Sequence, residues 1–190
     1  MTSAVNLMES LRRETAECHR QLEECVRPEQ RFSSLASYQD YLAQIRPLIN
    51  GLEDALGHLP WRGIGFDFES RRKIQLLDAD LHFFKIPFAP DKKITPPALE
   101  SLAAGLGCLY VLEGSTLGGQ VILRGLEKEG ITPGTGGAFF AAYGPRTGEM
   151  WKEFKDKAAS YCDTPEKINE AAESAGRTFD HYRQNIPPLK

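Results

Sequence analysis

No segment of 18 consecutive apolar residues occurs in this 190-residue chain, and no apolar run follows a basic start at its beginning. We therefore expect no membrane-spanning helix and no secretory signal, and we expect a cytoplasmic protein. Its four cysteines have no CxxC spacing, which argues against a zinc knuckle or a thioredoxin-type redox pair. With 23 basic and 26 acidic residues the net charge is −3, so a main role in nucleic-acid binding is disfavoured.

No stretch alternates between apolar and polar residues with the period of two that a half-buried strand needs. Apolar residues instead recur at spacings of three and four, which is the pattern of amphipathic helices. Hydrophobic residues make up 41% and charged residues 26%, close to the average of globular domains and unlike disordered or collagen-like chains. We predict an all-α protein with a single domain over residues 1–190 and about six helices.

Caps and prolines place the expected helices along the chain. Residues 130–148 contain six glycines and two prolines, and we expect a loop or a pair of short elements there. The six expected helices run over residues 7–26, from Ser37 to about Leu56, from Ser70 to about Phe84, from Thr95 through Leu126, from Thr147 to Tyr161, and from Thr164 to Tyr182.

Glycines interrupt one predicted helix in its middle, at Gly114, Gly118 and Gly119. Each costs about 0.5–1 kcal/mol relative to alanine in a helix interior, so the three together cost roughly 2–3 kcal/mol. Two explanations compete: Gly114 and Gly118 permit a close helix crossing, or they bring backbone directly against a broad, flat ligand. A phosphate-binding loop is disfavoured because no strand precedes the segment and no Gly-Lys-Ser/Thr follows.

The first predicted helix carries a single histidine, His19, one position from its apolar stripe. Most histidines in such a place are solvated or satisfied by a hydrogen bond. The competing hypothesis is an axial ligand to haem iron, because one imidazole is enough for that role. Glu23, one helical turn further on, would then orient the ring.

Two segments resemble haem oxygenases. Residues 11–23 (LRRETAECHRQLE) are similar to their proximal helix, and residues 110–120 (YVLEGSTLGGQ) to their distal helix in its bacterial form. Residues 137–140 (GAFF) and the stretch from Phe179 to Asn185-Ile186 are similar more loosely, so the resemblance covers roughly residues 5–186. It implies an all-α haem-oxygenase-like bundle with haem between a proximal and a glycine-bent distal helix. The type it suggests is the bacterial one found beside bacteriophytochromes.

The resemblance also implies roles for individual residues. His19 would be the iron ligand and Glu23 its support, while Gly114 and Gly118 would let the distal helix bend over the haem. Ser115 stands where animal members have an aspartate that organises distal waters, so that network must be built differently here, by Ser115, by Thr116 or by bound water. The resemblance implies four further haem contacts: Arg12 and Tyr110 at the propionates, together with Gly119 and Arg177. Lys152, Lys155 and Arg183 are additional basic candidates.

The implied activity is the oxidation of haem, as both substrate and cofactor, to biliverdin, carbon monoxide and ferrous iron. It would require O2 and an external electron donor, a ferredoxin or a reductase, and a bacteriophytochrome could receive the biliverdin. Neither nucleic acid nor a membrane is an expected partner. Two alternatives remain at this point: a non-catalytic haem-binding or trafficking protein on the same scaffold, and a helical interaction module whose glycines serve helix crossing.

Overall fold

A computed structural model describes residues 6–186. The prediction about a secretory signal concerns residues 1–5 in part, and these lie outside the described residues. The all-α prediction is confirmed, because no strand occurs between residues 6 and 186. The six helices of ten or more residues are α1 (Leu7–Val26), α3 (Leu35–Gly57), α4 (Ile74–Phe83), α5 (Leu102–Leu126), α7 (Thr147–Tyr161) and α8 (Pro165–Asn185). Shorter pieces are α2 (Pro28–Arg31), α6 (Ala138–Ala141) and the 3₁₀ turns η1 (Trp61–Ile64), η2 (Glu69–Arg71), η3 (Glu127–Glu129) and η4 (Gly144–Arg146).

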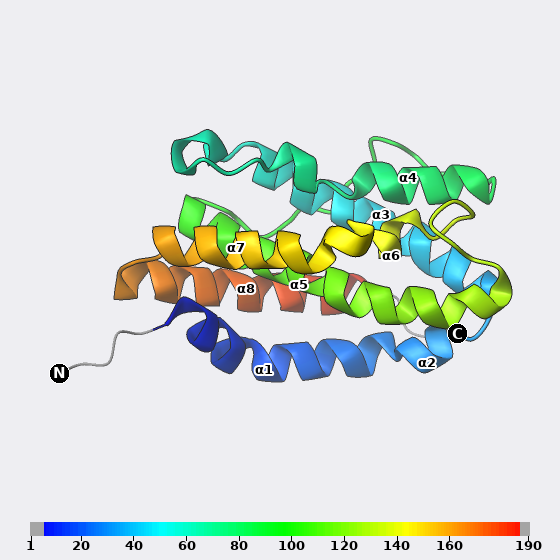
Figure 1. The fold of residues 1–190 in the computed structure, drawn as a ribbon, viewed down its shortest axis with the longest axis horizontal. Helices are drawn as coiled ribbons and strands as arrows, with labels where there is room; N and C mark the ends of the chain where they lie inside the picture. Colours follow the sequence, from blue (N-terminus) through cyan, green and yellow to red (C-terminus); the bar gives the residue numbers. More distant parts are fainter. Residues whose placement is uncertain (1–5, 187–190) are drawn as a thin grey trace.

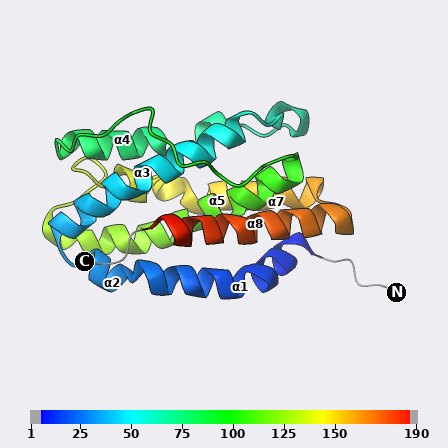
Figure 2. The same cartoon turned by 180° about the vertical axis from the view of Figure 1, so that it is seen from behind.

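The helices lie in layers (Figure 1). α3 and α4 form one outer layer, and α1 with α2 forms the opposite one. α5, α7 and α8 lie between them, and the view from behind shows α8 beside both α5 and α1 (Figure 2). Helix α8 therefore packs against both the N-terminal helix α1 and the central helix α5, which are about 100 residues apart in the chain.

The central helix is α5, and its first half is apolar on every side, as a fully buried helix should be. By length and composition Leu102–Glu129 could cross a membrane, but 56% of its apolar window is buried inside the protein, so it is the core helix of this bundle. A Cβ on Gly107 would lie 2.0 Å from the carbonyl oxygen of Ala171. A close crossing of α5 and α8 therefore requires glycine at this position.

Three predicted helix starts are confirmed, the first being that of α1 at Leu7. α7 begins at Thr147, and the Thr164 side chain caps α8 by accepting a hydrogen bond from the amide of Lys167. The predicted cap at Ser37 is wrong by three residues, since α3 begins at Leu35. Ser34 caps this helix and accepts the amide hydrogen of Ser37 at 3.2 Å.

The start at Ser70 is also wrong, because α4 begins at Ile74. Its cap comes from another helix: the Glu53 carboxylate of α3 accepts the amide hydrogens of Lys73 at 2.6 Å and of Ile74 at 3.2 Å. Burial raises the pKa of Glu53, with these two hydrogen bonds acting in the opposite direction. A cap supplied across 20 residues of chain leaves no local sequence signal.

The start at Thr95 is wrong as well, since α5 begins at Leu102 and Ser101 accepts the amide hydrogen of Ala104 at 3.0 Å. Residues before a proline avoid the helical region, and two consecutive prolines keep this segment irregular. The Ile94 amide donates to the Pro47 carbonyl at 3.0 Å, so the segment lies across α3. Between residues 130 and 148, α6 and η4 confirm the expected pair of short elements.

Candidate functional site

One exposed face of α1 carries three of the predicted site residues. Arg12, His19 and Glu23 are spaced by seven and four residues, which places them within about 40° of one another around a helix. The His19 side chain is 57% exposed, and its Nδ1 lies 3.7 Å from the Glu23 carboxylate. Its ring meets the edge of Phe179 from α8 at 5.6 Å between centroids. His19 is therefore anchored on one side only and can accept a further partner.

The second half of α5 has an equally open face, formed by Gly114, Leu117, Gly118 and Val121, which we name the glycine face. A Cβ on Gly118 would meet nothing within 4 Å, and one on Gly114 would meet only Trp151, at 3.9 Å. Leu117 and Val121 are 42% and 61% exposed, so two large apolar side chains have no protein cover. The helix-crossing explanation is therefore wrong for Gly114 and Gly118, and the ligand explanation remains.

Both open faces belong to the same region of the molecule. α1 and the second half of α5 lie near each other in both views, and each packs on α8 (Figures 1 and 2). Within residues 6–186 no cluster of three His, Cys, Asp or Glu side chains could hold a free metal ion. A single exposed imidazole beside an uncovered apolar surface fits haem, which brings its own four nitrogen ligands to the iron.

Two predicted contact residues lie off the glycine face, and their contact with haem stays a prediction, although Gly119 lines a small cavity together with Ser115. Gly119 is buried, and a Cβ there would lie 2.9 Å from the Phe140 carbonyl oxygen, so this glycine lets α6 pack on α5. Arg177 is two residues from Phe179, about 200° around α8. It lines a surface depression with Pro97 and Ala104 instead.

Other predicted residues surround the glycine face. The Tyr110 ring lies one turn before Gly114 and is 5.9 Å from the ring of Trp151 on α7. Among the additional basic candidates, Lys155 has its ammonium 5.9 Å from the same Trp151 ring. The Ser115 hydroxyl is exposed and donates to the Leu112 carbonyl at 2.7 Å, which leaves its lone pairs free to accept.

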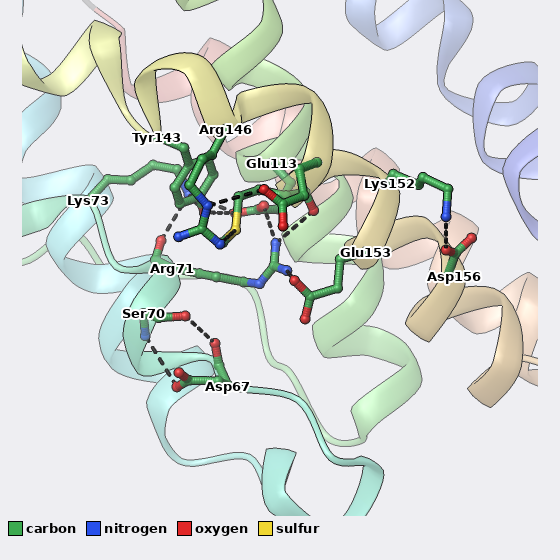
Figure 3. A network of polar contacts seen from close by, with 12 residues as sticks. Asp67, Ser70, Arg71, Lys73, Glu113, Tyr143, Arg146, Lys152, Glu153 and Asp156 are labelled. Carbon is green, nitrogen blue, oxygen red and sulfur yellow. Dashed lines mark hydrogen bonds and ion pairs between the residues drawn. The ribbon is translucent and has the colours of Figure 1, made fainter.

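Beside the glycine face, at Glu113, lies a buried network of charges (Figure 3). Glu113, directly before Gly114, accepts from Arg71 at 2.6 Å, from Lys73 at 2.8 Å and from the Tyr143 hydroxyl at 2.6 Å. Burial, and then the neighbouring Glu113 charge, raise the pKa of Tyr143. Arg71, Lys73 and Glu113 are all buried, so each charge depends on its partners for stability.

Sequence reasoning missed this network, as well as Trp151 and the exposed Leu117 and Val121 as site residues. One signal was available: Glu113 follows eleven residues without a charge in the most apolar helix of the chain. A carboxylate in such a helix needs buried cations, because an unpaired one is too costly to bury. Which cations these are could not be read from the sequence, since Arg71 and Lys73 lie about 40 residues away.

Comparisons with known proteins agree with this geometry. A family model described as "Heme oxygenase" matches residues 5–186. A protein named "Heme oxygenase" from Xanthomonas campestris pv. campestris (strain 8004) is 38% identical over 92 residues, which are 48% of this chain and 54% of that protein. The match thus spans about half the length of this relative.

A solved structure is similar over a longer stretch. The fold matches the NO- and CO-bound heme oxygenase of Neisseria meningitidis with a TM-score of 0.84 and 21% identity, covering 96% of this chain and 91% of the other. The likeness concerns the fold. Together with the family match over nearly the whole chain, it leads to one conclusion: the chain belongs to the haem oxygenase family.

Proposed function

We propose that this protein is a biliverdin-producing haem oxygenase, which cleaves haem at a meso carbon with release of carbon monoxide and ferrous iron. The observation that carries the proposal is the pair of open faces, with His19 exposed on α1 and an uncovered glycine face on α5. A flat macrocycle between them would cover Leu117 and Val121 and find backbone, with no Cβ, at Gly114 and Gly118. Family membership supports the same assignment.

Haem, when bound, supplies the iron at which O2 is activated; the protein orients it. His19 would ligate the iron through one imidazole nitrogen, and the Glu23 carboxylate, 3.7 Å from Nδ1, would favour a ring orientation with Nδ1–H toward it. The other nitrogen, Nε2, would then be the ligand. Arg12, on the same face of α1, and Tyr110 and Lys155, beside Trp151, could hold the carboxylates at the haem edge.

Ser115 is the proposed replacement for the aspartate of animal members. Its hydroxyl hydrogen is engaged by the Leu112 carbonyl, so its oxygen would accept a hydrogen bond from a water on the haem side. A serine that accepts cannot carry a negative charge as an aspartate does. We therefore expect water held here to be more weakly polarised than beside a carboxylate.

The remaining partners follow from this chemistry. The reaction consumes electrons, and a ferredoxin or a reductase would be their donor. A bacteriophytochrome as recipient of biliverdin and a cytoplasmic location complete the proposal.

The test is an optical titration with haemin, followed by ascorbate or a ferredoxin system in air. Loss of the Soret band with growth of broad red absorption would establish biliverdin formation. A stable Soret band would leave the alternative, a haem carrier, for which the replacement of aspartate by Ser115 is the one favourable feature. No Soret shift at all would refute both.

The ligand assignment needs its own variant. His19→Ala should abolish the histidine-ligated spectrum or sharply reduce turnover, because the iron loses its protein ligand. His58→Ala is the matched control, since His58 is exposed at the end of α3, on another element. Unchanged spectrum and turnover in His19→Ala would eliminate His19 as the ligand.

A further inference from the structure

The contacts that hold the glycine face in position come from the buried sides of α5. With no neighbour for a Cβ at Gly118 and only Trp151 near Gly114, packing on the open side cannot hold this part of α5 in place. The last charged anchor before the glycines is Glu113, whose carboxylate binds Arg71, Lys73 and Tyr143. Whatever fixes Glu113 therefore fixes where the backbone at Gly114 lies.

Arg71 is the member of the network that binds both α5 and α7, the helices that carry Gly114 and Trp151. Its Nη1 donates to the Glu113 carboxylate at 2.6 Å and to the Met150 carbonyl of α7 at 3.1 Å. Glu113 directly precedes Gly114, and Met150 directly precedes Trp151. One guanidinium nitrogen thus bridges the residues adjoining Gly114 and Trp151. Trp151 is the neighbour that a Cβ on Gly114 would meet, at 3.9 Å.

Further contacts surround Arg71 (Figure 3). Its Nη2 forms an ion pair with Glu153, one turn along α7, at 3.2 Å, and its plane stacks 4.6 Å from the Phe66 ring centroid. The Arg71 carbonyl accepts a hydrogen bond from the Lys73 ammonium at 2.9 Å. An apolar cluster could fill the same volume without the cost of burying charge, but it would lack directional bonds to two helices.

We propose that Arg71 is a positioning residue, whose guanidinium sets the spacing between the Gly114 backbone and the Trp151 ring and thereby the geometry of the surface offered to haem. The part of this inference that concerns haem rests on the proposed function. The part that concerns the spacing of α5 and α7 does not, and it can be tested on the protein alone.

A closely matched control exists in the same fold. Arg46 of α3 is also buried, pairs with the Asp78 carboxylate at 2.8 and 3.1 Å, and donates to the carbonyls of Ala89 and Pro90. It stacks 4.7 Å from Phe88, much as Arg71 does on Phe66. None of these contacts involves α5 or α7, so Arg46→Met removes an equivalent group away from the site.

The first measurement is amide hydrogen exchange of the haem-free protein. Arg71→Met should accelerate exchange by about tenfold or more in residues 114–121 and 149–153, with smaller changes in α3 and α4. Arg46→Met should show the opposite pattern. If Arg71→Met accelerates exchange equally in all helices, or gives the same pattern as Arg46→Met, the proposal is overturned and Arg71 has only a general structural role. If Arg71→Met does not fold, Arg71→Lys, which keeps the charge but not the two-helix bridge, should give the same pattern at smaller amplitude.

The second measurement uses the haem complex. In the ferrous carbonyl form, Arg71→Met should shift or broaden the C–O stretching band, because the distal surface is less well defined, whereas Arg46→Met should leave the band unchanged. An unchanged band in Arg71→Met would overturn the inference about haem. Failure of the unmodified protein to bind haem would refute the proposed function and leave the exchange result standing.

Discussion

Gly118 and Gly107 lie on the same helix but should respond in opposite ways to the same substitution. Both are replaced by alanine, which is the better helix former by about 0.8–1.0 kcal/mol per residue. At Gly118 the new methyl group would meet nothing within 4 Å, so this gain should appear in the stability of the haem-free protein. At Gly107 the methyl carbon would lie 2.0 Å from the Ala171 carbonyl oxygen, which is far inside van der Waals contact.

The magnitudes follow from these contacts. Gly118→Ala should stabilise the haem-free protein by about 0.5–1 kcal/mol, which corresponds to a rise in Tm of roughly 1–4 °C for a chain of this size. Gly107→Ala must push α8 away from α5, and overpacking of this kind costs about 1–3 kcal/mol or more, which exceeds the propensity gain. Thermal and urea unfolding of the haem-free proteins measure both effects.

The functional half of the prediction concerns a larger side chain. Gly118→Leu should fold with full helical content, because the space is open, but its side chain would cover the glycine face and compete with haem. Haem affinity or biliverdin yield should fall accordingly. If Gly118→Ala lowers Tm as Gly107→Ala does, or if Gly118→Leu forms biliverdin at the unmodified rate, the assignment of the open face is wrong.

Three further predictions rest on buried polar groups. Asp80→Ala should cost about 1–3 kcal/mol in urea unfolding, because its carboxylate accepts the amide hydrogens of Ala138 and Phe139 at the start of α6; no loss would refute this capping role. Burial lowers the pKa of His181, so the folded state favours the neutral imidazole, and its contribution to stability should be lost as pH falls below about 6.5. His181→Gln should therefore flatten that part of the curve of Tm against pH. An unaltered curve would contradict this prediction. Burial raises the pKa of Cys108 to about 12, so iodoacetamide at pH 8 should modify exposed Cys25 and spare Cys108 in the native protein, as peptide mass mapping would show.

Helix type and the two motif-bearing segments were predictable because they depend on local information. The 3.6-residue period of apolar side chains is visible in any window, and threonine caps such as Thr164 act on amides three residues away. The starts of α4 and α5 were misplaced for the opposite reason. Glu53 caps α4 from another helix, and the segment before α5 is held by a hydrogen bond to Pro47 of α3.

The glycines of α5 show most clearly where local information ends. In the sequence, Gly107, Gly114, Gly118 and Gly119 are equivalent, each a costly residue in a helix. In the folded chain Gly107 meets α8 and Gly119 meets α6, whereas Gly114 and Gly118 are left largely uncovered. Periodicity assigns a residue to a side of its own helix, but only the neighbours brought from distant parts of the chain determine whether that side is packed or open. The same holds for Glu113, whose charge was visible in the sequence and whose partners, Arg71 and Lys73, were supplied by the tertiary structure alone.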